Sequence, residues 1–194
     1  MRNYTESPML ADTACALEAR DSMCSFSSSR DWRETSPDDW GGVVDEAQLE
    51  WLSGLAHLPY KTTLVFGHHP FPKTTWASDE PMMSISNAEE VIAVLSAAAP
   101  AAVYFNGHNH VHSIARGWTY APKWTFVQCA AALSASVCRT VVVSERDVVV
   151  ETVHCQPALT QLAQSYQSAL DGYMNVSAAV GTKSDQNVRV VLTI

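Results

Sequence analysis

Two stretches decide the fold of this chain: TTLVFGHHP at residues 62–70 and AVYFNGHNHVH at residues 102–112. Each opens with a short run of apolar and β-branched or aromatic residues, which is typical of a strand buried on both faces. Each run is broken by a glycine, which allows a sharp change of chain direction. Histidines follow at once in both stretches. The pattern therefore predicts two buried strands whose ends carry imidazole groups.

A helical pattern precedes each of these strands. The first helix is expected to open at Asp45, which together with Gln48 resembles a capping box. The second is expected to open at Asn87, capped in the same way with Glu90, and to end before Pro100. In sheets connected through helices, ligands gather beyond the carboxyl ends of the strands. Both histidine stretches are therefore expected at one such edge.

The remaining sequence predicts more sheet and one more helix. We expect a strand at 124–130, a hairpin of strands at 140–144 and 148–154, a helix across 159–170 and a last strand at 187–194. Residues 1–40 show no sustained period and are rich in serine, aspartate and arginine, which favours a loop-rich segment. The prediction is an α/β (α+β) fold, with one domain at 41–194 after that segment.

Composition excludes several classes of protein. The chain has 12 basic and 20 acidic residues, a net charge of −8, which argues against a nucleic-acid partner or an anionic membrane held by bulk electrostatics. No apolar run is long enough to cross a bilayer, and residues 1–10 lack the continuous apolar stretch of a signal peptide. The five cysteines include no C-x-x-C pair. These features predict a soluble, cytoplasmic protein.

Five of the seven histidines lie in the two stretches, and they carry the functional signal. Imidazole suits zinc, iron, manganese and similar ions. Two histidines spaced i, i+2 in extended backbone point to the same side of the chain, so His108 and His110 can share a site. We predict His68, His108 and His110 as metal ligands. His69 is expected to face the substrate, and His112 either continues the face of His108 and His110 or is exposed.

In their order, separation and strand context, GHHP at 67–70 and GHNH at 107–110 resemble the last two motifs of the calcineurin-like metallophosphoesterases. Residues 42–58 resemble the helix that precedes the first of these motifs. The resemblance covers about residues 41–154. It implies a β-sandwich flanked by helices, with metal ions at the strand ends.

The resemblance also implies roles for individual residues. His68 and His108 would bind one ion and His110 the other, with manganese, iron or zinc as the metal. The implied reaction is hydrolysis of a phosphomonoester or phosphodiester, in a small molecule or a macromolecule, by metal-activated hydroxide. His69 or His112 would orient the phosphate or assist the leaving group, and these two are the predicted catalytic residues.

The three earlier motifs of that family, D-x-H, G-D-x-x-[DE] and G-N-H-[DE], do not occur in this sequence. The bridging carboxylate and the asparagine ligand are therefore unaccounted for. The carboxylates that could substitute are Asp31, Asp38, Asp39, Asp79 and Glu80. The sequence thus predicts the C-terminal half of such a domain, with the N-terminal half missing or replaced. A partial sheet is expected to expose an edge strand that could pair with a second copy.

Two other functions stay open from the sequence. The first is a catalytically inactive remnant that serves as an interaction module, which the missing motifs favour. The second is a mononuclear zinc-binding protein whose ligands are a comb of His108, His110 and His112.

Overall fold

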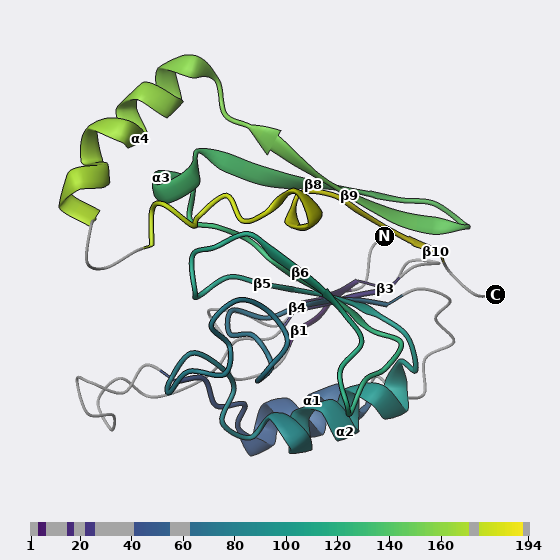
Figure 1. Ribbon diagram of the computed structural model, residues 1–194. Helices are drawn as coiled ribbons and strands as arrows, with labels where there is room; N and C mark the ends of the chain where they lie inside the picture. The colour runs from purple at the N-terminus through teal and green to yellow at the C-terminus, as the bar shows by residue number, and fades with distance from the viewer. Residues whose placement is uncertain are drawn as a thin grey trace.

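The computed structural model describes residues 4–6, 15–17, 22–25, 41–54, 63–170 and 175–191. In this part of the chain, two sheets and their helices are stacked in layers (Figure 1). Helices α1 (Glu46–Gly54) and α2 (Ala88–Ala98) cover one face of the larger sheet, and the smaller sheet faces the other. The predicted mixed architecture of the α+β kind is confirmed.

The larger sheet has seven strands in the order β1-β2-β3-β4-β5-β7-β6. Their bounds are β1 Tyr4–Glu6, β2 Cys15–Leu17, β3 Ser22–Ser25, β4 Thr63–Phe66, β5 Val103–Asn106, β6 Ser113–Arg116 and β7 Thr125–Gln128. Neighbouring strands from β3 through β4 and β5 to β7 run parallel. Because β4 pairs with both β3 and β5, the first histidine strand lies in the interior of the sheet.

The smaller sheet is antiparallel, in the order β10-β9-β8. Its strands are β8 Val137–Val143, β9 Asp147–His154 and β10 Val188–Val191, and β8 and β9 form the predicted hairpin. A short helix α3 (Ala132–Ala135), helix α4 (Pro157–Leu170) and a 3-10 turn η2 (Lys183–Asp185) complete the described elements. None of the described helices combines the length and apolar character that crossing a bilayer needs.

Strands β4 and β5 are buried on both faces because each contributes side chains to two cores. In β4 and β5, Val65 and Tyr104 pack toward α1 and α2. Their neighbours Leu64, Val103 and Phe105 pack between the two sheets. Side chains alternate across a strand, so a strand with a core on each side reads as a continuous apolar run. This double burial fixes β4 and β5 as the frame of the site.

Helix α4 forms as predicted, but its apolar stripe does not enter the core. Leu159, Leu162 and Tyr166 are each more than half exposed, whereas Ala163 is buried. At α1 the half of the predicted capping box made by Asp45 is confirmed, since the Gln48 N–H donates to Asp45 Oδ1 at 2.8 Å.

At α2 the capping prediction is wrong, because the Asn87 side chain makes no cap hydrogen bond. Instead, Asn87 Oδ1 accepts the Val44 N–H at 3.1 Å and its Nδ2 donates to the Val44 carbonyl at 2.8 Å. The asparagine therefore ties the chain before α1 to the start of α2.

Candidate functional site

The two histidine stretches meet because β4 and β5 are adjacent parallel strands. Their hydrogen bonding continues past the strand ends: the Gly67 N–H donates to the Phe105 carbonyl at 3.0 Å, and the Gly107 N–H donates to the His68 carbonyl at 3.0 Å. Both turns therefore leave the sheet side by side, at its carboxyl edge. This is the edge at which the sequence predicts a ligand site.

Three imidazole rings come together there, and we call His68, His69 and His108 the histidine cluster. The ring centroids are 4.0 Å apart for His69 and His108, 5.0 Å for His68 and His69, and 5.3 Å for His68 and His108. His110 is close enough for its charge to act on both His68 and His108. The His69 ring is buried, whereas His68 is exposed to solvent. One part of the cluster is thus buried in the protein, and another part is open to solvent.

The backbone of the second turn is not extended. His108 has φ 60° and His110 has φ 59°, both in the left-handed region. The Asn109 N–H donates to the Gly107 carbonyl at 2.8 Å, which closes a three-residue turn around His108. The extended i, i+2 geometry expected for His108 and His110 is therefore wrong. Each left-handed residue costs about 1–2 kcal/mol, and such strain is concentrated at functional sites.

The ring of His108 has a defined tautomer. Its Nε2 lies 3.2 Å from the carbonyl oxygen of Met82, and a carbonyl can only accept a hydrogen bond. Nε2 therefore carries the proton, and the ring lone pair is on Nδ1. Met82 belongs to the long connection at 71–86 and is itself left-handed, with φ 63°. This connection thus sets the orientation of a predicted metal ligand.

His68, His108 and His110 are neutral at pH 7. Burial and the charge of His68 lower the pKa of His108 to about 4, against an opposing hydrogen bond to Met82. Burial and the charge of His110 lower the pKa of His68, and burial lowers the pKa of His110. Neutral imidazole is the form that binds a metal ion or accepts a proton.

A strap formed by Gly42–Val44 holds His69 in place. The Gly42 N–H donates to the Ser84 carbonyl at 3.2 Å, and the Gly42 carbonyl accepts the Ser86 N–H at 2.8 Å. This brings Gly42 so close to His69 that a Cβ on residue 42 would lie 2.7 Å from the His69 Cγ. On the other side, the Tyr104 hydroxyl donates to the His69 carbonyl at 2.6 Å. His69 is therefore fixed in both ring and backbone.

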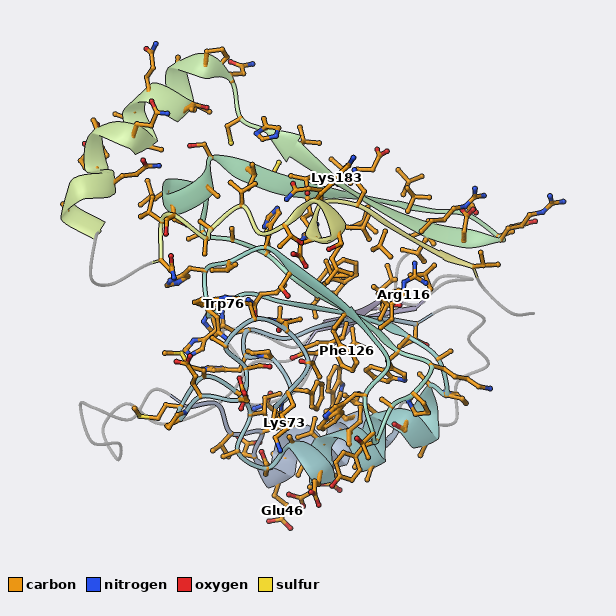
Figure 2. The ribbon with its side chains drawn as sticks, viewed as in Figure 1. Glu46, Lys73, Trp76, Arg116, Phe126 and Lys183 are labelled. Carbon is orange, nitrogen blue, oxygen red and sulfur yellow. The ribbon has the colours of Figure 1, made fainter. Side chains whose placement is uncertain are left out.

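A buried polar layer lies next to the cluster, at the ends of β5 and β7. Asn106 Nδ2 and Thr75 Oγ1 donate to Gln128 Oε1 at 3.0 and 2.8 Å, and Asn109 Nδ2 donates to the Trp76 carbonyl at 2.9 Å. These bonds tie the connection at 71–86 to the histidine turn. Figure 2 shows Trp76 among the loops at one end of the sheet, with Arg116 toward the other end.

The sequence motifs did not predict this layer. The available signal was a polar residue at the last position of a buried strand, as in Asn106 of β5 and Gln128 of β7. Asn106 Oδ1 and Asn109 Oδ1 are buried without a hydrogen-bond partner among the described residues. A buried unpaired acceptor costs about 1–3 kcal/mol, so two of them beside one turn point to a functional constraint.

His112 is not part of the cluster. Its side chain is fully buried, and Nδ1 accepts the Ala130 N–H at 2.8 Å. Burial and the charge of Arg139 lower its pKa to about 4 against the opposing charge of Asp185. The described residues therefore do not form the comb expected of His108, His110 and His112, and a catalytic role for His112 stays a prediction. Its observed contact is structural.

The side chains predicted as ligands are of a chemical type that binds metal ions. The imidazoles of His68, His108 and His110 are the donors that zinc, iron and manganese accept, and they are in the neutral form. As the side chains stand, no three His, Cys, Asp or Glu residues in the described ranges are arranged to hold an ion. Asp79 and Glu80 are exposed on the connection at 71–86. Asp31, Asp38 and Asp39 lie outside the described residues.

Comparison of the sequence with protein-family models and with curated proteins finds no match. The resemblance to the metallophosphoesterases therefore rests on the sequence motifs alone.

Gly42→Ala tests the fit of the strap against His69. The added Cβ would overlap the His69 ring, so either the strap or the ring must move. We expect a loss of about 1–3 kcal/mol in the free energy of unfolding by urea, as for other overpacking changes, together with a shift of the His69 ring resonances in NMR. Gly54→Ala is the matched control, since a Cβ there meets nothing within 4 Å. Unchanged His69 resonances in Gly42→Ala would contradict this packing.

The lowered histidine pKa values predict acid destabilisation of the metal-free protein. Below the ordinary value of 6.5 the unfolded chain binds protons, while His108 and His112 in the native state stay neutral down to about 4. The free energy of unfolding should therefore fall as the pH drops from 6.5 to 4 and be fully restored above 6.5. Each pKa unit corresponds to about 1.4 kcal/mol.

His112→Asn isolates one contribution to this pH dependence. The asparagine oxygen keeps an acceptor near the Ala130 N–H but does not titrate. Urea unfolding measured across the same pH range should give a shallower fall than for the unmodified chain. A curve parallel to that of the unmodified chain would show that His112 does not titrate in this way.

Proposed function

We propose that this chain is a metal-dependent hydrolase of phosphate esters, built on a partial metallophosphoesterase-type sandwich. The observation that carries the proposal is the convergence of His68, His69 and His108 at the carboxyl ends of two adjacent parallel strands. Two glycine-broken turns from separate parts of the chain supply these rings. Such convergence from distant segments is expected of a ligand site and is not needed for folding.

Charge supports a cation in this site. A phosphate ester is anionic, whereas the chain carries a net charge of −8 and the imidazoles of His68 and His108 are neutral at pH 7. Lys73 is the only basic residue in the connection at 71–86, and it is exposed. An anionic substrate would thus meet little positive charge unless the site holds a metal ion.

We assign His68, His108 and His110 to the metal, with His108 binding through Nδ1 because Nε2 donates to Met82. A bound ion supplies charge neutralisation at the phosphoryl oxygens. We assign His69 to orienting the phosphate through a ring N–H, because Gly42 and Tyr104 immobilise it. A fixed donor loses little entropy on binding, so it positions a substrate better than a free side chain.

The strain around the cluster supports the same proposal. The left-handed His108 and His110, and the two unpaired amide oxygens beside them, are all unfavourable to folding. Their combination in one turn is expected where the chain is selected to place donors for a ligand.

A metal titration tests the proposal. Chelator-treated protein is titrated with Zn²⁺ and Mn²⁺ by isothermal calorimetry, and hydrolysis of 4-nitrophenyl phosphate and bis(4-nitrophenyl) phosphate is followed in parallel. We expect one or two ions per chain, a rise in Tm on binding, and activity that depends on the added metal. His68→Ala and His108→Ala should each weaken binding by at least about tenfold and lower the activity with it.

His154→Ala is the matched control, because His154 is an exposed histidine at the end of β9, in the other sheet. It should bind metal as the unmodified chain does. The proposal fails if His108→Ala binds metal normally, or if His154→Ala loses as much affinity as His108→Ala.

A second candidate is a metal-binding module without turnover. The side chains present favour this candidate. The described residues bring imidazoles to the cluster, but they form no group of three metal ligands. The same titration separates the two functions. Metal binding that depends on His68 and His108, with no hydrolysis of either substrate, would favour the binding module.

A further inference from the structure

A cavity lies on the face of the larger sheet that α1 and α2 cover. It has a volume of about 560 Å³, and its walls are residues 72–73, the start of α2 and the turn at 118–120 between β6 and β7. Figure 2 shows Lys73 on this side of the sheet, near α1 and α2. No histidine lines the cavity, so it is separate from the histidine cluster.

Two aromatic rings form a corner of this cavity. The rings of Trp118 and Tyr120 have centroids 4.9 Å apart and planes inclined at 67°. Trp118 is anchored by Phe71, with centroids 5.4 Å apart, and packs on the core. Tyr120 is held by its hydroxyl, which donates to Glu89 Oε1 at 2.7 Å. The corner is therefore formed before any ligand arrives.

The cavity lining is negative overall. It contains the carboxylates of Glu89 and Glu90 and a single basic residue, Lys73. The two carboxylates stand in the first turn of α2, where they offset the partial positive charge of the helix start. The hydrogen bond and the negative charge of Glu89 raise the pKa of Tyr120. An electron-rich corner thus lies beside two carboxylates.

We propose that this cavity binds a small organic cation, with a quaternary ammonium group against the corner of Trp118 and Tyr120. Aromatic faces attract such cations through the ring quadrupole, and the carboxylates of Glu89 and Glu90 add long-range attraction. A bare metal ion is a poorer occupant, because the aromatic walls offer it no ligand atoms. An anion is disfavoured by the two carboxylates. The proposal does not depend on the function of the histidine cluster.

A pair of probes of nearly equal shape tests the charge requirement. Choline and 3,3-dimethylbutan-1-ol differ in that a trimethylammonium group replaces a neutral tert-butyl group. Saturation-transfer NMR on the full chain at low salt follows the methyl signal of each probe. We expect choline to bind at least about tenfold tighter than the alcohol. Equal binding of the two probes would overturn the proposal.

Four variants locate the site. Tyr120→Leu and Glu89→Gln should each weaken choline binding roughly two- to tenfold, and both positions are exposed, so the fold is retained. Lys73→Gln should tighten binding, because it removes the like charge of the lining. Glu46→Gln, in the first turn of α1 and outside the lining, is the matched control and should leave binding unchanged.

Two outcomes would contradict this assignment. If Lys73→Gln weakens choline binding, attraction between the cation and the charge of the lining does not drive binding. If Glu46→Gln weakens choline binding as much as Glu89→Gln does, choline is attracted by the net negative charge of the chain and not by this cavity. His108→Ala should leave choline binding intact, which separates this site from the histidine cluster.

Discussion

The parallel pairing of β4 with β5 is the constraint on which the rest of this structure depends. The two strands are far apart in sequence, and α2 connects them so that both carboxyl ends reach one edge. Hydrogen bonds from Gly67 to Phe105 and from Gly107 to His68 extend the pairing into the turns. A shift of register by one residue would exchange the faces of Val65 and Tyr104 and separate the two turns. The double core therefore fixes the relative position of the imidazoles.

This arrangement includes features that lower the free energy of unfolding. Left-handed histidines and buried amides with unpaired oxygens oppose folding. The bonds that hold these features come from elements remote in sequence: the Gly42–Val44 strap, Tyr104, and the layer around Gln128. A site held from several sides changes little when a ligand binds, which reduces the entropy lost on binding.

The sequence predicted the elements that repeat a strong local pattern. β4, β5, the β8–β9 hairpin and α4 follow from apolar periodicity, and the meeting of the two turns follows from the parallel connection through α2. One error concerns a long-range contact and the other a local turn. Asn87 bonds to Val44 and does not cap α2, and the GHNH turn coils where an extended backbone was expected.

The features that the sequence did not predict depend on contacts between residues remote in sequence. Gly42 has no local signal that it contacts His69, and the pairing of Asn106 with Gln128 depends on the register of β5 and β7. For His112, the spacing from His110 suggested a common face. Its ring instead accepts a hydrogen bond from Ala130, which only the folded chain brings near.

The central claim is that imidazoles from two distant turns share one site. Nuclear Overhauser contacts between ring protons of selectively labelled histidines measure this most directly. The account predicts contacts between His69 and His108, whose centroids are 4.0 Å apart, and between His68 and His108, at 5.3 Å. It predicts none between His108 and His154, in the other sheet. Absence of the contact between His69 and His108 in a folded sample would contradict the account.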